Sequence, residues 1–282
     1  MAEQEVDVVS ALGLVDIQVP LDDGHLFVRS WQPKGASSRS AILLFHDSLG
    51  SVELWRDLPL QLAGATGRRV VAYDRMGFGQ SSPRSERLSG DFIGEQARSA
   101  VPAICAALGL ARLVPFGHSV GGAMAVATAA AWPGSCEAVV TVAAQAFVEA
   151  RTIEGIEAAM AAFAAPQEFA RLSRYHGEKA RWVFDAWTET WLSPAFAHWT
   201  LDDELRALKC PVLSIHGDQD EYGSLAHPER IVSLAAGGGE MKVIKGCGHV
   251  PHREQPQQII ALVQSFLASA AVPPTATGQA AD

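Results

Sequence analysis

The fold is decided by residues 114–124, which read VPFGHSVGGAM. Strand-forming residues run into Gly117, Ser119 and Gly121, and an alanine-rich segment follows that we expect to be helical. Glycine weakens both strands and helices, so glycines placed two before and two after a serine need a physical reason. Where a strand turns sharply into a helix, neighbouring backbones approach closely and leave room only for small residues. The pattern therefore predicts a serine at the tip of a tight strand–helix turn.

Short apolar runs rich in β-branched residues alternate with longer helical patterns along the 282 residues. This alternation is typical of an α/β fold, and we predict a mostly parallel sheet of eight strands, buried on both faces. Asp22-Asp23-Gly24 lies between the first two runs and is a hairpin signal, so the sheet should start with antiparallel strands. The expected strands are Val15–Pro20, Leu26–Trp31, Ala41–His46, Arg69–Asp74, Arg112–Phe116, Ala138–Ala143, Pro211–His216 and Met241–Ile244, and the expected helices are Leu54–Ala65, Asp91–Leu108, Ser119–Ala131, Ala226–Ala235 and Pro256–Ala270.

One long segment interrupts this alternation, because residues 145–207 contain no strand candidate and become helical and aromatic. We expect these residues to form a helical cap inserted between two parts of one core, residues 1–144 and 208–270. The polar, proline-containing tail at 271–282 is expected to be disordered. The aromatic residues either form the cap's own core or face a ligand; they are Phe147, Phe163, Phe169, Trp182, Phe184, Trp187, Trp191, Phe196 and Trp199.

Composition and charge exclude several classes of protein. The formal net charge is −9, and the 22 basic residues form no run, which argues against a nucleic-acid partner. No stretch approaches the roughly 18 apolar residues of a membrane span, and the N-terminal residues are acidic where a signal peptide would be basic. The cysteines are scattered without paired spacing, which is typical of reduced thiols; they are Cys105, Cys136, Cys210 and Cys247. We therefore expect a cytoplasmic globular protein with no membrane partner.

The segment Gly117-His118-Ser119-Val120-Gly121 after a strand resembles the nucleophile elbow of the α/β-hydrolase superfamily. A serine nucleophile needs a histidine base, and that base needs an acid; in this fold the chain order is serine, acid, histidine. Two further segments resemble the family's acid and histidine loops, VLSIHGDQDEYGS (212–224) and VIKGCGHVPHREQP (243–256). The resemblance implies a catalytic triad of Ser119, Asp220 and His249, each after the carboxyl end of a strand, where open α/β sheets build their sites.

Two other aspartates compete with Asp220 for the role of the acid. Asp218 is expected to turn the loop, and Asp74 belongs to a segment, AYDRMGFGQSS, that resembles a structural loop of the family after strand four. The sequence also departs from the family pattern at Pro115, which lies in an expected central strand, where the missing N–H is poorly tolerated.

The oxyanion hole is implied by a second resemblance. Residues 43–51 read LLFHDSLGS and are similar to the family's His-Gly segment after strand three, which supplies one oxyanion N–H. Asp47 stands where glycine is usual, and aspartate is among the better-tolerated substitutes at positive φ. By position the two N–H donors are those of Ser48 and Val120. The Ser48 hydroxyl either adds a third hydrogen bond or is a solvated turn serine.

The remaining histidines give no sign of a metal site. His118 lies inside the elbow and is expected to pack beside the nucleophile or contact substrate, rather than act as the base. His252 follows His249 by three residues, but no third ligand is apparent. The sequence contains no metalloprotease, P-loop or dinucleotide motif. We therefore expect neither a metal nor a cofactor.

A serine at the elbow favours acyl chemistry, because an aspartate occupies this position in the superfamily's haloalkane dehalogenases and epoxide hydrolases. We expect hydrolysis of an ester or thioester of a small apolar acyl group, with Trp187 and Trp191 at helical i, i+4 spacing either contacting substrate or docking the cap. The alternatives are a carbon–carbon hydrolase of a ring-cleavage diketone, a lactone hydrolase, and a non-catalytic ligand receptor. A positive group in the cap either engages an anion or is a solvated helix face; it comprises Arg171, Arg174, His176 and Lys179.

Overall fold

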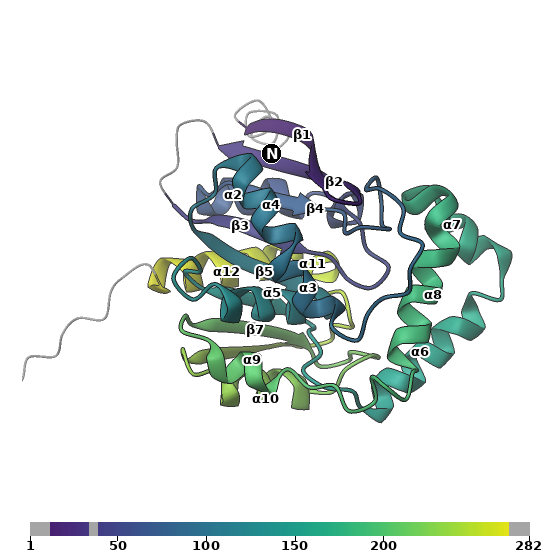
Figure 1. Cartoon of the computed structure of the whole chain (residues 1–282). Coiled ribbons are helices and arrows are strands. Elements are labelled where there is room, and N and C mark those ends of the chain that lie inside the picture. Colours follow the sequence, from purple (N-terminus) through teal and green to yellow (C-terminus); the bar gives the residue numbers. More distant parts are fainter. Residues whose placement is uncertain (1–11, 34–38, 271–282) are drawn as a thin grey trace, which may run out of the picture.

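The computed structural model describes residues 12–33 and 39–270, and its centre is one eight-stranded sheet (Figure 1). The strand order is β1-β2-β4-β3-β5-β6-β7-β8. β1 pairs antiparallel with β2, and β2 with β4, while all other neighbours are parallel, so the predicted fold class is confirmed. The expected tail at 271–282 lies outside the described residues. The strands are β1 Leu12–Leu21, β2 Gly24–Pro33, β3 Ala41–Phe45, β4 Val70–Tyr73, β5 Leu113–His118, β6 Val139–Val142, β7 Val212–Gly217 and β8 Gly239–Ile244.

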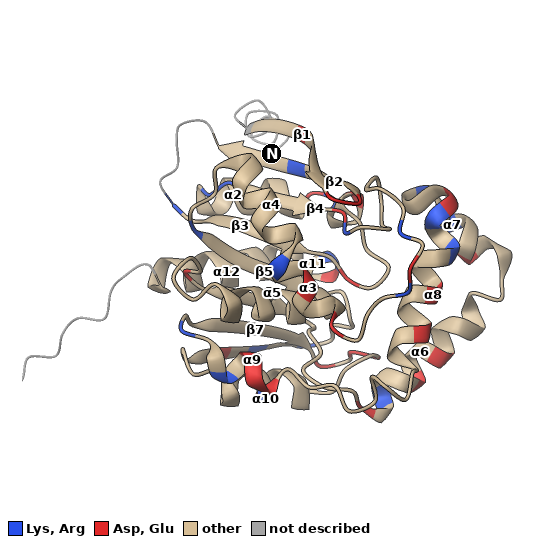
Figure 2. Cartoon of the chain, in the orientation of Figure 1, with Lys and Arg blue, Asp and Glu red and all other residues tan. Residues whose placement is uncertain are grey.

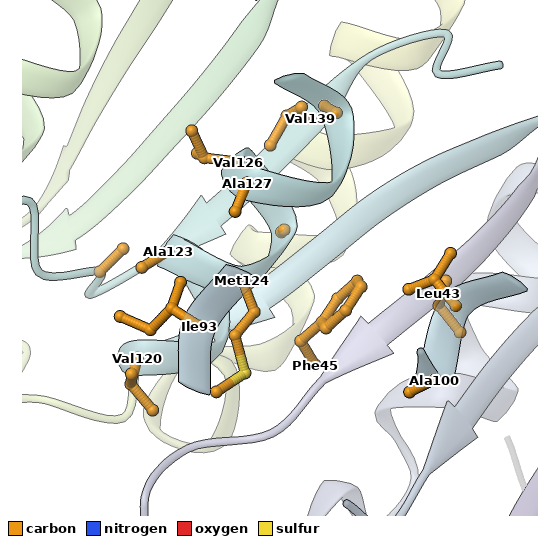
Figure 3. Close-up of a cluster of buried hydrophobic side chains, with 14 of the residues drawn as sticks. Leu43, Phe45, Ile93, Ala100, Val120, Ala123, Met124, Val126, Ala127 and Val139 are labelled. Atoms are coloured by element: carbon orange, nitrogen blue, oxygen red, sulfur yellow. The ribbon is translucent and has the colours of Figure 1, made fainter. Parts of the chain in front are cut away.

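Helices cover both faces of this sheet. Successive strand residues point to opposite faces, so Leu43 and Phe45 of β3 join one apolar cluster with α3, α4, α5, α9 and α10, while Ile42 and Leu44 join another with α2 and α12. Figure 3 shows Phe45 beside Met124 of α5. The helices are η1 Val52–Trp55, α2 Leu58–Thr66, α3 Phe92–Arg98, α4 Ala100–Leu108, α5 Val120–Ala131, α6 Ala150–Ala162, α7 Pro166–His176, η2 Gly177–Lys179, α8 Ala180–Trp191, α9 Asp202–Ala207, α10 Ala226–Leu234, α11 Pro251–Glu254 and α12 Pro256–Ala270.

Two expected helices are each interrupted, and a proline lies at each interruption. The helix expected over Asp91–Leu108 divides at Ser99 into α3 and α4. Pro102 has no N–H to donate to the carbonyl of residue 98, and its ring crowds that carbonyl, so one continuous helix is disfavoured. The helix expected over Leu54–Ala65 likewise divides into η1 and α2, with Pro59 in the first turn of α2.

Pro115 is accommodated inside β5 by a local change in strand pairing. On one side it pairs in register with Leu43 of β3. On the other side Leu113 pairs with Cys136 and Phe116 with Val140, so the register shifts by one residue beside the proline. This irregularity lets a central strand contain a residue that lacks an N–H.

The helices between β6 and β7 form a separate group beyond the sheet. Figure 1 shows α6, α7 and α8 together at one end of the molecule. Phe163, Phe169 and Phe184 pack against one another within this group, with ring centroids 4.7–5.2 Å apart. α9 differs, because it packs against α5 and α10 beside the sheet, with Leu205 buried. We propose that α6–α8 are the cap expected from the sequence.

Side chains of this group bind the loops that follow β3 and β4. From the sequence alone, the same side chains could equally have formed a solvated helix face. The Gly79 N–H donates to His176 Nδ1 at 2.9 Å, and His176 Nε2 donates to the Leu49 carbonyl at 3.0 Å. Lys179 donates to the carbonyls of Phe78, at 3.1 Å, and Ser81. His176 and Lys179 are thus docking residues, and of the positive group only Arg171 lines the cavity described below.

Charge is dispersed over the molecule. Figure 2 shows Lys and Arg interspersed with Asp and Glu along the visible ribbon. Within the described part of the chain, no helix combines the length and the apolar character needed to cross a bilayer.

Candidate active site

Ser119 lies at the tight turn between β5 and α5, with φ 56° and ψ −129°. Its neighbours must be small for a steric reason. A Cβ on Gly117 would lie 1.9 Å from the Gly121 carbonyl oxygen, and one on Gly121 would lie 2.0 Å from the Phe45 carbonyl oxygen. The Ser119 N–H donates to the Val142 carbonyl at 2.9 Å, which ties the turn to β6. The glycine spacing in the sequence therefore reflects backbone contacts around a strained serine.

His249, in the loop after β8, forms a buried pair with Asp220, in the loop after β7. His249 Nδ1 lies 2.9 Å from each carboxylate oxygen of Asp220. The two residues are 9% and 1% exposed. Burial by itself would lower the pKa of His249, but the hydrogen bond and negative charge of Asp220 outweigh it, so the pKa is raised. The pair leaves Nε2 of the imidazole as the atom that can exchange a proton in the cavity.

Asp220 is held as an anion by several donors. Its Oδ1 accepts from the N–H groups of Tyr222, at 2.8 Å, and Gly223, at 3.1 Å. His216 Nε2 lies 3.2 Å from Oδ2. Burial would raise the pKa of Asp220, yet the hydrogen bonds from His216 and His249 lower it below its usual range. The carboxylate is thus ionised and fixed in orientation.

The competing aspartates, Asp218 and Asp74, accept hydrogen bonds from backbone N–H groups of loops. Asp218 Oδ1 accepts from the Gly246 N–H at 2.7 Å and joins two loops. Asp74 accepts from the N–H groups of Val52 and Gln80, each at 2.7 Å. Burial raises the pKa of Asp74. Neither carboxylate is bonded to His249.

The Ser119 hydroxyl is turned toward Gln145, a residue that the sequence gave no reason to single out. Ser119 Oγ lies 3.2 Å from Gln145 Oε1, and among the described residues this is the hydroxyl's hydrogen bond. Among the described residues no hydrogen bond joins Ser119 Oγ to His249, although both side chains line the cavity described next.

A cavity of about 300 Å³ opens over these groups. Ser119, His249 and Gln145 line it, as do the sequence candidates Ser48 and His118. Its apolar part comes mainly from α6–α8 and the residue that ends α6, and the predicted pair of tryptophans belongs to it. These residues are Ile156, Ala159, Phe163, Leu172, Trp187 and Trp191, and the core adds Leu49, Leu54 and Val250. One space therefore joins a polar floor to an apolar chamber.

The loop after β3 is fixed by Asp47. Its Oδ1 accepts from the Leu49 N–H at 2.9 Å, and its carbonyl accepts from Arg75 Nη2 at 2.8 Å. Asp47 is absent from the described residues with positive φ, so the backbone reason suggested for glycine at this position was wrong. Within the described chain, the N–H groups of Ser48 and Val120 donate to no protein acceptor. Both amides are therefore unused hydrogen-bond donors.

His118 has a role that the sequence did not reveal. Its Nδ1 lies 3.2 Å from Asp47 Oδ2, and its Nε2 lies 2.8 Å from the His249 carbonyl oxygen. Burial would raise the pKa of Asp47, but the hydrogen bond and charge of His118 lower it, so this carboxylate is ionised. The Asp47 carboxylate and the His249 carbonyl both offer acceptor oxygens, so each ring nitrogen of His118 faces an acceptor. His118 therefore ties the backbone of His249 to the loop of Asp47.

A comparison with known families agrees with this architecture. The model described as alpha/beta hydrolase family matches residues 42–262. The chain belongs to the alpha/beta hydrolase family. Among residues 12–33 and 39–270 this hydrolase has no group of three or more His, Cys, Asp or Glu side chains placed to hold a metal ion.

Solved structures share the hydrolase fold at low sequence identity. One is the 2-hydroxy-6-oxo-6-phenylhexa-2,4-dienoate hydrolase from Rhodococcus sp., with 18% identity, a TM-score of 0.76, and 91% of this chain and 99% of that chain covered. The carboxylesterase CesB from Bacillus subtilis has 20% identity, a TM-score of 0.66, and coverage of 95% and 97%. A bacterial membrane phospholipase A has 24% identity, a TM-score of 0.73, and coverage of 95% and 90%.

Proposed function

We propose that this hydrolase cleaves a carboxylic ester or thioester of a small apolar acyl group through an acyl-serine intermediate. The observation that carries the proposal is that Ser119, on its strained turn, and His249, which is paired with Asp220, line the same cavity. A nucleophile, a base and an orienting acid are the groups that acyl transfer needs.

The first half-reaction forms the acyl-enzyme. Ser119 Oγ attacks the substrate carbonyl carbon while His249 Nε2 takes the hydroxyl proton. The carbonyl oxygen becomes an oxyanion that accepts from the N–H groups of Ser48 and Val120. His249 then gives its proton to the leaving alcohol or thiol, and the carbon–oxygen or carbon–sulfur bond breaks.

The second half-reaction releases the acid. Water attacks the acyl carbon as His249 takes one of its protons, and the bond to Ser119 Oγ breaks as that proton returns to the serine. Asp220 stabilises the imidazolium in both halves. Losing one oxyanion donor in an enzyme of this kind costs about 2.7–4 kcal/mol, which sets the scale for the Ser48 and Val120 amides.

The shape of the cavity supports an apolar acyl group. Trp187 and Trp191 are 9% and 3% exposed, and both line the chamber over Ser119. Burying an apolar side chain of a substrate against such surfaces is worth about 25 cal/mol per Å². Both ring nitrogens of His118 are engaged, so we assign it to positioning His249 instead of hydrogen bonding to substrate.

The test is turnover of a series of 4-nitrophenyl esters from acetate to decanoate, by wild type and by Ser119→Ala. We expect hydrolysis by wild type that is lost in the variant. The double variant Ser119→Ala/His249→Ala should be little slower than either single variant, because these residues act as a unit. Inertness toward every ester together with cleavage of a ring-cleavage diketone would replace this proposal by carbon–carbon hydrolysis. Inertness toward both substrates would favour a ligand receptor.

A further inference from the structure

Among the charged side chains around the cavity, one cation has no direct ion pair. Four lining residues carry formal charge: Asp47, Glu168, Arg171 and Arg253. Asp47 is paired with His118 at 3.2 Å, and Arg171 with Glu168 at 2.8 Å. Within the described residues Arg253, which also lines the cavity, forms no ion pair.

The hydrogen bonds of Arg253 are also incomplete. One terminal nitrogen, Nη2, donates to the Leu54 carbonyl at 2.9 Å. Its Nε is buried and has no partner. Burial lowers the pKa of Arg253, although the negative charge of Asp47 opposes the shift. Burying a guanidinium whose donors lack partners costs free energy, and an anion that accepts from those donors offsets this cost.

The position of Arg253 makes it accessible to a substrate. It belongs to α11, which begins two residues after His249, so the imidazole and the guanidinium border the same space. Tyr175 lines this space too, and its hydroxyl has no hydrogen-bond partner among the described residues. The apolar chamber comes mainly from the cap helices, whereas Arg253 comes from the core.

We propose that Arg253 is an anion-binding subsite of this active site, and that the substrate is an ester or thioester carrying a carboxylate as well as its apolar group. The subsite rests on the proposed function for its place in catalysis. Guanidinium presents donors in a planar fork that matches a carboxylate in two parallel hydrogen bonds, and the Tyr175 hydroxyl can add a third. The carboxylate would give the guanidinium the direct ion-pair partner that it lacks in the protein.

Two matched pairs of esters test this subsite. The first places the charge on the acyl chain, as the mono-4-nitrophenyl ester of glutaric acid against 4-nitrophenyl pentanoate. The second places it on the leaving group, as 4-carboxyphenyl pentanoate against its methyl-ester analogue. We expect wild type to prefer the anionic member of at least one pair by about tenfold or more in kcat/KM, the scale of one charge-assisted hydrogen bond. Absence of a preference in both pairs overturns the proposal.

Variants then assign the preference to Arg253. In Arg253→Met the ratio should fall toward one, and Arg253→Lys, which keeps the charge but not the fork, should retain part of it. Arg171→Met is the matched control, because Arg171 lines the same cavity but already has a carboxylate partner, and it should keep the ratio. The melting temperature of each variant reports whether it folds. A preference that survives in folded Arg253→Met contradicts the assignment.

A binding measurement separates the subsite from the proposed chemistry. Calorimetric titration of Ser119→Ala with glutaric monoanilide and with pentananilide needs no turnover. Tighter binding of the anionic amide, lost with Arg253→Met in the same background, supports the subsite even if no ester is hydrolysed. Equal binding of the two amides, together with no charge preference among hydrolysed esters, removes the subsite and leaves the ester hydrolase standing.

Discussion

Replacing Asp220 by asparagine probes how the proposed base is oriented. The carboxylate accepts from His249 Nδ1, and its Oδ1 also accepts from the Tyr222 and Gly223 N–H groups. Asparagine has the same shape but only one acceptor oxygen. The two backbone donors should keep that oxygen, which turns the amide NH₂ toward His249. The amide N–H then replaces Oδ2, 2.9 Å from Nδ1, and favours the tautomer of His249 with its proton on Nε2, the atom that must accept the proton of Ser119.

The expected loss of rate follows from this wrong tautomer of His249. A base that already carries its proton at Nε2 cannot assist the attack, and the matching substitution in a serine protease lowers kcat by about 10⁴. At 1.36 kcal/mol for each factor of ten, that is about 5 kcal/mol of barrier. The fold should survive, because the substitution is nearly isosteric and two of the hydrogen bonds remain.

The assay is single-turnover hydrolysis of a 4-nitrophenyl ester by Asp220→Asn, with the melting temperature measured in parallel. Asp218→Asn is the matched control, because Asp218 bonds the Gly246 N–H outside the site, and its rate should stay near that of wild type. A folded Asp220→Asn protein within tenfold of the wild-type rate refutes the reasoning. Asp74 would then be the next candidate for the acid.

Three further outcomes follow from the geometry. Because Asp220 raises the pKa of His249 and only the neutral imidazole accepts a proton, kcat/KM should rise with pH through a midpoint above about 6.5; a midpoint below that value contradicts the pairing. Gly121→Ala should destabilise the fold by about 1–3 kcal/mol or more in urea unfolding, since its Cβ would lie 2.0 Å from the Phe45 carbonyl oxygen, whereas Gly134→Ala, with open space, should cost little. Trp187→Ala should lower kcat/KM for pentanoate esters by about tenfold or more while acetate esters change less; equal losses would remove Trp187 from the acyl chamber.

The parts of the site that follow one another in sequence were the ones that could be predicted. Positions 117 and 121 on either side of Ser119 are glycines because a Cβ at either position would collide with a backbone oxygen. The spacing of the glycines in the sequence therefore indicates this constraint directly. The alternation of apolar strands and helices likewise reports burial on both faces of a sheet. Local chemistry therefore predicted the fold, and the resemblance of two loops then pointed to Asp220 and His249.

Features that depend on contacts between residues far apart in the chain could not be predicted from local sequence patterns. His118 and Asp47 lie 71 residues apart, and only the folded chain brings an imidazole between a carboxylate and the His249 carbonyl. Arg253 and Leu54 are 199 residues apart, so the incomplete bonding of the guanidinium has no local signal. Pro115 pointed away from a central strand, yet the shift in the pairing with β6 accommodates it.

The central claim is that Ser119 is made nucleophilic by His249, and labelling with a fluorophosphonate followed by peptide mapping tests it most directly. We expect one adduct, on Ser119, absent from Ser119→Ala and formed at least about a hundredfold more slowly in His249→Ala, since general-base assistance is worth about 10²–10⁴ in rate. An adduct on another residue, or the same labelling rate without the imidazole, would contradict the account.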